Sequence, residues 1–317
     1  MPKRLPPQTT HPLNPPASAA FPYVFFEHVA EHPFQPGNPA FNLCNAWWLM
    51  DAAFLSYSNE ATIRREYQKI NGADVHFVAG KRSTQCYVAS TDDWIVLAFR
   101  GTQVDDFWQS VLDWTIDARF VPVLDSHGDW VHAGFKSAIE QVWPDVSGRV
   151  RTLQATRRRP LWICGHSLGA ALATIAANLC ADDATLGFTG LYTFGSPRVG
   201  DRSFGREIRP ANVFRFQNDS DLVTHVPLGL VFHHVGALQF IDGGGHLHAN
   251  VDRARQLLLR AGALSASDAH SISGILQQNG HDLPLPGFLA DHAPINYAIL
   301  IWNCYEASLP ASSESHA

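Results

Sequence analysis

The sequence has few charged residues and no excess of basic ones. Charged residues make up 16% of its 317 positions, and the formal net charge is −6 at pH 7. A nucleic-acid-binding surface is rich in lysine and arginine, whereas basic residues cluster here only at 157–159. We interpret that triplet as a solvated loop, and we do not expect nucleic acid as a partner.

A cysteine pattern typical of a disulfide framework or a metal site is also missing. The five cysteines are odd in number and widely spaced: Cys44, Cys86, Cys164, Cys180 and Cys304. Several lie in apolar segments, so buried free thiols are expected, although a single bridge is compatible with the spacing. No metal ion and no organic cofactor is predicted.

Long apolar runs are scarce as well. Only residues 161–180 approach the roughly 18 uncharged positions of a membrane span, and their composition has another explanation, given below. A secretory leader needs an apolar stretch of roughly 7–15 residues, and none precedes the first predicted helix. We therefore expect no transmembrane segment and, by default, a cytoplasmic location. Secretion by another route, or from a trimmed chain, stays open.

What the sequence does contain is enough apolar material for one large domain. Hydrophobic residues make up 46% of the chain, which is ample for a well-buried core. No internal repeat or second composition regime interrupts it. We predict a Pro-rich, extended arm over 1–41, a single domain over 42–305, and a flexible tail over 306–317.

Local patterns predict strands that alternate with helices. The expected helices cover 42–57, 133–146, 251–261 and 295–304. The expected strands are a hairpin at 74–77 and 84–90, single strands at 94–100, 161–164, 191–194 and 213–216, and a pair at 230–235 and 237–241. This alternation predicts an α/β fold with a mostly parallel sheet and helices on both faces. Functional groups gather beyond the carboxyl ends of such strands.

The segment 161–180 contains the strongest chemical signal. A short apolar strand leads into Gly165-His166-Ser167-Leu168-Gly169, and an Ala/Leu-rich helix follows. Such a sharp strand-to-helix turn needs glycines, because a Cβ at Gly165 or Gly169 would collide with the neighbouring chain. It exposes Ser167 to the first N–H groups of the helix, which favour negative charge. We predict a nucleophilic serine; the alternative is an ordinary glycine turn that contains one.

A serine hydroxyl needs a base to remove its proton and an acid to orient that base. In α/β hydrolases both follow the serine in the chain. Asp221 is favoured as the acid, because it follows the strand 213–216 and leads into an apolar pair, and His292 stands in a loop before the last helix. The candidate acids are Asp201, Asp219, Asp221 and Asp242, and the candidate bases are His225, His233, His234, His246, His248, His270, His281 and His292. Residue chemistry alone leaves this choice open.

Five spaced motifs together resemble the class 3 (fungal-type) lipase family, which has the α/β-hydrolase fold. The resemblance covers roughly residues 45–300. The motifs are Phe99-Arg100-Gly101-Thr102, His132-Ala133-Gly134-Phe135, Gly165 to Gly169, Tyr192 to Gly200, and Asp221-Leu222-Val223. Two positions depart from the usual pattern: Thr224 stands where the family has a proline, and Ala170 where a third glycine is common.

This resemblance implies a role for each site residue. Ser167 is the expected nucleophile, Asp221 the acid, and His292 the base within a His-x4-Tyr pattern that ends at Tyr297. The backbone N–H groups of Thr102 and Leu168 are the expected oxyanion donors.

A lid-like segment is expected after the oxyanion strand, within 103–125. Its apolar side chains fit one face of a helix: Phe107, Trp108, Val111 and Leu112. Such an amphipathic flap would cover the site in water and meet a lipid surface. Ordinary packing of this helix against the core is the alternative.

The expected function is that of a serine carboxylic-ester hydrolase of lipase type, which cleaves acylglycerols or related lipid esters through an acyl-enzyme. Its expected partners are a lipid or ester substrate and, transiently, a lipid–water interface. Phospholipase A1, feruloyl esterase and acyltransferase chemistry use the same triad and stay open. A non-catalytic lipid-binding scaffold is a further alternative, which the complete triad disfavours.

Overall fold

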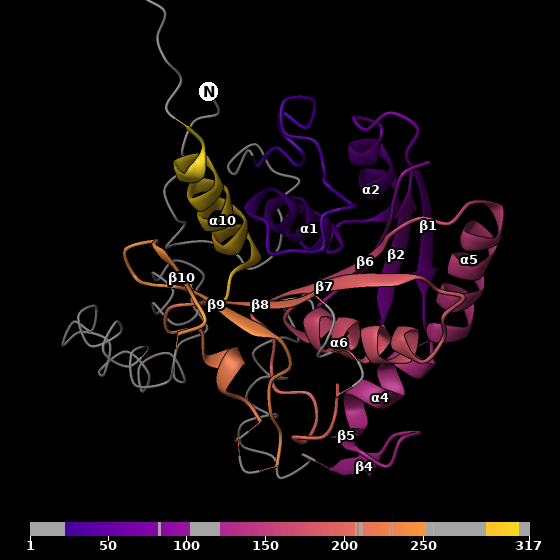
Figure 1. Ribbon diagram of the computed structural model, residues 1–317. Helices are drawn as coiled ribbons and strands as arrows, with labels where there is room; N and C mark the ends of the chain where they lie inside the picture. The colour runs from indigo at the N-terminus through magenta and orange to yellow at the C-terminus, as the bar shows by residue number, and fades with distance from the viewer. Residues whose placement is uncertain are drawn as a thin grey trace, which may run out of the picture.

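An eight-stranded sheet forms the centre of the molecule (Figure 1). The computed structural model describes residues 23–81, 84–101, 121–206, 208, 212–227, 229, 231–251, 256 and 290–310. The strand order is β1-β2-β3-β6-β7-β8-β9-β10. The strands are β1 (Asp74–Ala79), β2 (Gln85–Ser90), β3 (Ile95–Phe99), β6 (Leu161–His166), β7 (Phe188–Phe194), β8 (Asn212–Asn218), β9 (Ala237–Ile241) and β10 (Leu247–Ala249).

The middle of this sheet is parallel and its margins are antiparallel. The pairs between β3, β6, β7, β8 and β9 are parallel, whereas the pairs β1–β2, β2–β3 and β9–β10 at the margins are antiparallel. The predicted mostly parallel sheet is therefore confirmed. Because parallel strands end at one edge, the ends of β3, β6, β7 and β8 bring their following residues together there.

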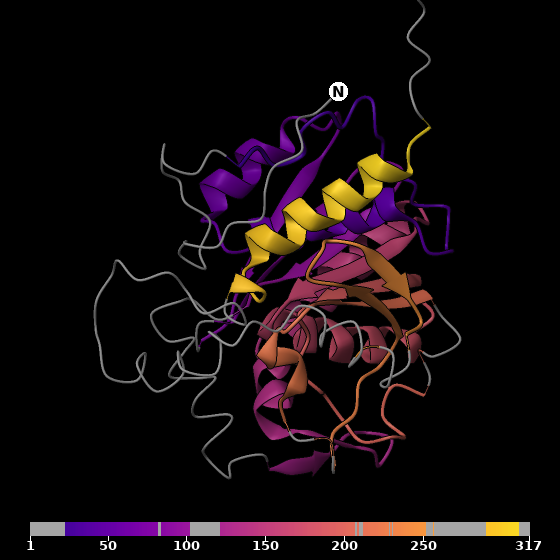
Figure 2. The same ribbon diagram turned by 90° about the vertical axis from the view of Figure 1, so that its left-hand side faces the viewer.

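Two helical layers cover the sheet. Along β3 and β6, Ala98 and Cys164 belong to the cluster that contains α1, whereas Leu97 and Ile163 belong to the one that contains α6. This alternation is the period of two that a sheet covered on both faces requires. The helices are α1 (Leu43–Leu55), α2 (Glu60–Tyr67), α4 (Ala133–Glu140), α5 (Trp143–Thr156), α6 (Leu168–Ala181) and α10 (Pro294–Ser308). Figure 2 shows α10 crossing the α1 side of the sheet.

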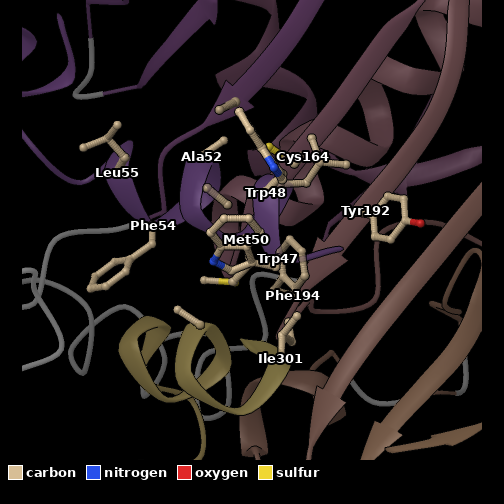
Figure 3. Packing of buried hydrophobic residues seen from close by; sticks show 14 of the residues in the cluster. Trp47, Trp48, Met50, Ala52, Phe54, Leu55, Cys164, Tyr192, Phe194 and Ile301 are labelled. Carbon is tan, nitrogen blue, oxygen red and sulfur yellow. The ribbon is translucent and has the colours of Figure 1, made fainter. Parts of the chain in front are cut away.

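Twelve residues of helix α1 are buried, and all of them are apolar except Asn45 and Asp51. The sheet, α10 and the chain before α1 surround it, as expected for such a helix. Trp47 packs on Trp302 of α10 with ring centroids 4.8 Å apart. Figure 3 shows Trp47 and Trp48 between Ile301 of α10 and Cys164 of β6.

The segment 23–41 belongs to the core, although the sequence predicted an extended arm that ends at residue 41. Phe26 and Phe34 are buried against α1. Polar contacts hold the same segment: the indole of Trp48 donates to the carbonyl of His32 (2.8 Å), and that of Trp162 to the carbonyl of Pro36 (3.0 Å). The prolines obscured these apolar anchors, because the aromatic residues between them show no regular period.

Other elements differ from prediction in detail. The strand predicted at 230–235 is wrong: β9 pairs with β8 on one side and with β10 on the other, which leaves it no free edge. The single helix predicted at 133–146 is two helices, α4 and α5. Four elements had no predicted counterpart: α2, the edge strand β10, and the separate hairpin of β4 (Pro122–Leu124) and β5 (Trp130–His132). Most of the helix predicted at 251–261 lies outside the described residues.

Two further observations concern the cysteines and the length of the helices. All five cysteines are free thiols, and only Cys304 is not fully buried. Within the described ranges, every helix is too short or too polar to cross a bilayer.

Candidate active site

The turn between β6 and α6 has the strained geometry predicted for residues 165–169. Ser167 adopts φ +59° and ψ −129°, a left-handed conformation that side chains other than glycine rarely take. A Cβ at Gly165 would overlap the carbonyl of Gly169, and one at Gly169 would overlap the carbonyl of Phe99. The predicted need for glycine at both positions is confirmed.

The Ser167 side chain lies buried at the amino end of α6. Its Oγ makes no hydrogen bond to any described residue, so the hydroxyl is not committed to a structural role. Leu168 is the first residue of α6, and its N–H has no acceptor within the helix. Together with the helix dipole, this end favours negative charge beside the serine.

His292 lies in the turn before α10, with its ring against a carboxylate. Its Nδ1 is 2.9 Å from both oxygens of Asp221, and both side chains are buried. Because an ionised carboxylate only accepts hydrogen bonds, Nδ1 carries the proton. The Nε2 of the neutral ring then holds a lone pair, which is the state a general base requires.

Asp221 is held from several directions after the end of β8. It caps the short 3-10 helix η1 (Leu222–His225) by accepting from the N–H of Val223 (2.9 Å). The hydroxyl of Tyr297 donates to Oδ2 (2.7 Å) and itself accepts from the N–H of Asn218 (2.9 Å). Burial and the Asp221 charge raise the pKa of Tyr297 well above its usual value, so the hydroxyl stays a donor. Thr224, at the proline position, donates to the Asp221 carbonyl (2.8 Å).

The turn that carries His292 contacts the serine turn directly. The Nε2 of His166 lies 2.8 Å from the backbone oxygen of His292, and the two rings are 4.6 Å apart. Asp291 ties the same turn to the end of β8, because its carboxylate accepts from the N–H of Ser220 (3.1 Å). The structure thus brings Asp221, His292 and the Ser167 turn together.

A second Asp–His pair exists, but it lies elsewhere. His248 Nε2 is 2.8 Å from Asp242, and His246 also faces that carboxylate. This pair sits at the turn between β9 and β10, three strands from β6, which corresponds to about 14 Å at the usual strand spacing. Asp242 and the two histidines therefore organise an edge turn.

The remaining candidates have structural surroundings or lie outside the described residues. Asp201 accepts from the N–H groups of Ser203 and Phe204, and His234 binds the carbonyl of Thr224. Asp219 lies two residues before Asp221, His225 is the last residue of η1, and His233 forms an isolated bridge with Gly200 ahead of β9. His270 and His281 lie outside the described residues.

Two further sets of predicted residues lie outside the described residues. They are the expected oxyanion donor Thr102 and the lid residues Phe107, Trp108, Val111 and Leu112. Gly101, the last described residue before Thr102, is buried next to the backbone oxygen of His166. The end of β3 thus reaches the serine turn. Among the described side chains, no group of three or more potential ligands is arranged to hold a metal ion.

The sheet is mostly parallel, and a Gly-x-Ser-x-Gly turn between a strand and a helix presents a serine at positive φ. These two features together define the α/β-hydrolase class. A solved structure of the triacylglyceride lipase of Rhizomucor miehei superposes with a TM-score of 0.57 at 22% identity, over 80% of this chain and 94% of that one. The family model described as Lipase (class 3) matches residues 96–230. This match supports the resemblance to the class 3 lipase family that the motifs predicted.

Two relatives show the range of proteins that it resembles. The secreted mono- and diacylglycerol lipase A of Penicillium cyclopium is 35% identical over 153 residues, which cover 46% of this chain and 47% of that protein. Phospholipase A1-II 2 of Oryza sativa subsp. indica is 29% identical over 198 residues, with 46% and 47% covered. The chain thus spans about half the length of these relatives.

Proposed function

We propose that this protein is a serine carboxylic-ester hydrolase of lipase type, which acts on acylglycerols or related lipid esters. The observation that carries the proposal is the placement of His292. Its Nδ1 donates to the buried carboxylate of Asp221, and its backbone contacts the residue before Ser167. A base, its orienting acid and a strained serine thus share one edge of the sheet.

The geometry supports an acyl-enzyme mechanism. Ser167 Oγ attacks the ester carbonyl while His292 Nε2 takes its proton, and Asp221 stabilises the imidazolium that forms. The N–H groups of Leu168 and Thr102 bind the oxyanion of the tetrahedral intermediate. The imidazolium then protonates the departing alcohol, which leaves an acyl-serine. Water, deprotonated by His292, attacks that ester and releases the acid and the free serine.

Acylglycerols are the favoured substrates because the Penicillium relative is named for mono- and diacylglycerols and matches at the higher identity. The rice relative is named a phospholipase A1, which makes phospholipids the second candidate. Nothing in the described residues favours feruloyl esters or acyl transfer. The assembled acid and base argue against an inert lipid-binding scaffold.

Ser167 is fully buried, so a lipid carbonyl reaches it only after some covering part of the protein moves. We propose that the lid-like segment within 103–125 opens when the substrate enters. Its apolar residues Phe107, Trp108, Val111 and Leu112 would then contact the lipid–water interface.

One substrate panel tests the function. We expect hydrolysis of p-nitrophenyl butyrate, diacylglycerol and tributyrin, with a rise in tributyrin activity once its solubility limit is passed. Ser167→Ala should lower kcat by about 10⁶-fold while leaving the circular dichroism spectrum unchanged. A fluorophosphonate probe should label the wild-type protein and not the variant.

Three outcomes would contradict or change the proposal. Retention of most activity in Ser167→Ala would remove the serine from the mechanism. Absence of probe labelling in the folded wild-type protein would favour the lipid-binding scaffold. Faster turnover of phosphatidylcholine than of diacylglycerol would replace the acylglycerol assignment with phospholipase activity.

A further inference from the structure

A hydrogen-bonded chain runs behind the serine turn and ends on the backbone of the proposed base. The hydroxyl of Tyr57 lies 2.8 Å from Nδ1 of His166, and Nε2 of His166 lies 2.8 Å from the carbonyl oxygen of His292. His166 is buried within the 165–169 turn. Tyr57 follows the end of α1, 109 positions before His166 in the sequence.

The backbone carbonyl of His292 determines which group donates and which accepts in each of these two hydrogen bonds. A carbonyl oxygen only accepts, so His166 donates to His292 through Nε2–H. The Nδ1 of a neutral His166 is then an acceptor, and the Tyr57 hydroxyl donates to it. Burial and the neighbouring His292 ring hold the pKa of His166 well below its usual range, which keeps the ring neutral. Burial likewise raises the pKa of Tyr57, which keeps its hydroxyl protonated.

Tyr57 also contacts the strand that leads to the expected oxyanion donor. A Cβ at Gly101 would overlap the Tyr57 hydroxyl and come within 2.9 Å of the His166 carbonyl. The end of β3, the serine turn and the His292 turn therefore meet around one phenol and one imidazole. Neither side chain has an expected role in bond making or breaking.

We propose that Tyr57 and His166 are positioning residues that fix the main chain of His292 and thereby aim its Nε2 at Ser167. This inference rests on the proposed hydrolase function. Asp221 holds the His292 ring through Nδ1, and His166 holds the main chain of His292 beside the serine turn. The two contacts together fix both the ring and the backbone that carries it. Displacements of about 1 Å in such a group cost about 10²-fold in rate.

Two amide substitutions separate the two bonds of His166. The amide nitrogen of Gln reaches the place of Nε2, so His166→Gln keeps a donor to His292 and loses the acceptor for Tyr57. The amide of Asn reaches only the place of Nδ1, so His166→Asn keeps a partner for Tyr57 and loses the donor to His292. Tyr57→Phe removes one hydroxyl and leaves His166 otherwise intact.

Kinetics with p-nitrophenyl butyrate then report on position. We expect His166→Asn to lower kcat about 10- to 100-fold with KM within about twofold. His166→Gln should recover to within about threefold of wild type, and Tyr57→Phe should lose about 3- to 10-fold. The acid limb of the pH–rate profile should move in the Asn variant and not in the Gln variant. Tyr192→Phe, which removes another buried hydroxyl bonded to Asn42, should leave kcat unchanged.

An activity-independent measurement keeps this inference separate from the function. Nitrogen-15 NMR of the wild-type imidazoles should show His166 neutral with its proton on Nε2, and the His292 resonances should shift in His166→Asn but not in His166→Gln. Equal kcat losses in the two variants, or a proton on Nδ1 of His166, would overturn the positioning role. Wild-type protein without esterase activity would overturn the proposed function, while the NMR comparison would still decide whether His166 holds His292.

Discussion

Two carboxyl groups are fully buried among the residues that the structure describes, and their surroundings are similar. Asp51 of α1 accepts hydrogen bonds from the hydroxyl of Tyr23 and the N–H of Phe26. Asp221 accepts from the hydroxyl of Tyr297 and the N–H of Val223. Each thus has one tyrosine and one backbone donor. Asp51 lies under the segment 23–41, whereas Asp221 lies at the catalytic edge of the sheet.

The two carboxyl groups differ in one neighbour, because only Asp221 contacts the imidazole of His292. Asp221 shares its charge with that ring through Nδ1. No described histidine is bonded to Asp51, and burial raises the pKa of this carboxyl to about 7 despite the stabilising bonds from Tyr23 and Phe26. Burial and a tyrosine bond therefore do not identify a catalytic acid. The same donor set serves packing at one site and proton transfer at the other, according to whether a base completes it.

Replacing the acid Asp221 should have the largest effect on activity. In Asp221→Asn the amide no longer holds the proton on Nδ1 of His292, so the ring loses the tautomer that accepts from Ser167. We expect kcat for p-nitrophenyl butyrate to fall about 10⁴-fold with little change in KM. Asp51→Asn is the matched control, and it should keep wild-type kcat. Similar losses in the two variants would show that both carboxylates act only through stability.

Removing the tyrosine donor from Asp221 should have a smaller effect. Tyr297→Phe deletes one of the bonds to the carboxylate and leaves the His292 bond in place, so kcat should fall about 3- to 10-fold. Because Asn218 also loses an acceptor, the melting temperature should drop as well. If kcat is unchanged while the melting temperature falls, the phenol serves packing alone, as Tyr23 does.

The smallest effect concerns stability and its pH dependence at Asp51. The folded-state pKa of about 7 lies above the ordinary value of 3.8, so between these values the unfolded chain is ionised and the folded chain is not. The contribution of Asp51 is thus fully present below about pH 4 and is lost as pH rises to about 7. Each pH unit in that window is worth about 1.4 kcal/mol.

Urea denaturation from pH 4 to pH 8 measures this contribution. The free energy of unfolding of wild type minus that of Asp51→Asn should fall with rising pH, by up to about 4 kcal/mol. A difference that is flat with pH would mean that Asp51 is already ionised in the folded protein.

The sheet was largely predictable, because buried parallel strands are short apolar runs that need no distant information. The strands β3, β6, β7 and β8 overlap the predicted ones. The position of segment 23–41 was not predictable, since its binding to α1 depends on indole and carboxylate contacts between residues far apart in sequence. The strand at 230–235 was wrong because apolar composition says nothing about which sheet edges are free.

The site shows the same division. Gly165 and Gly169 are local requirements of the turn, so the position of Ser167 could be inferred from spacing alone. The pairing of Asp221 with His292 spans 71 positions, and residue chemistry left several acids and bases open until the family motifs were considered. Tyr57 was missed entirely. No local pattern marks it, because its partner His166 is reached only through the fold.

The backbone conformation of Ser167 lowers the stability of the folded protein. A residue held at φ +59° and ψ −129° stores strain of order 1–3 kcal/mol, and glycine at this position would relieve it. Since the Ser167 hydroxyl bonds to no described residue, that exchange would forfeit no structural hydrogen bond there. Mutational drift toward greater stability thus leads away from a reactive hydroxyl at this turn, and only selection for turnover retains it.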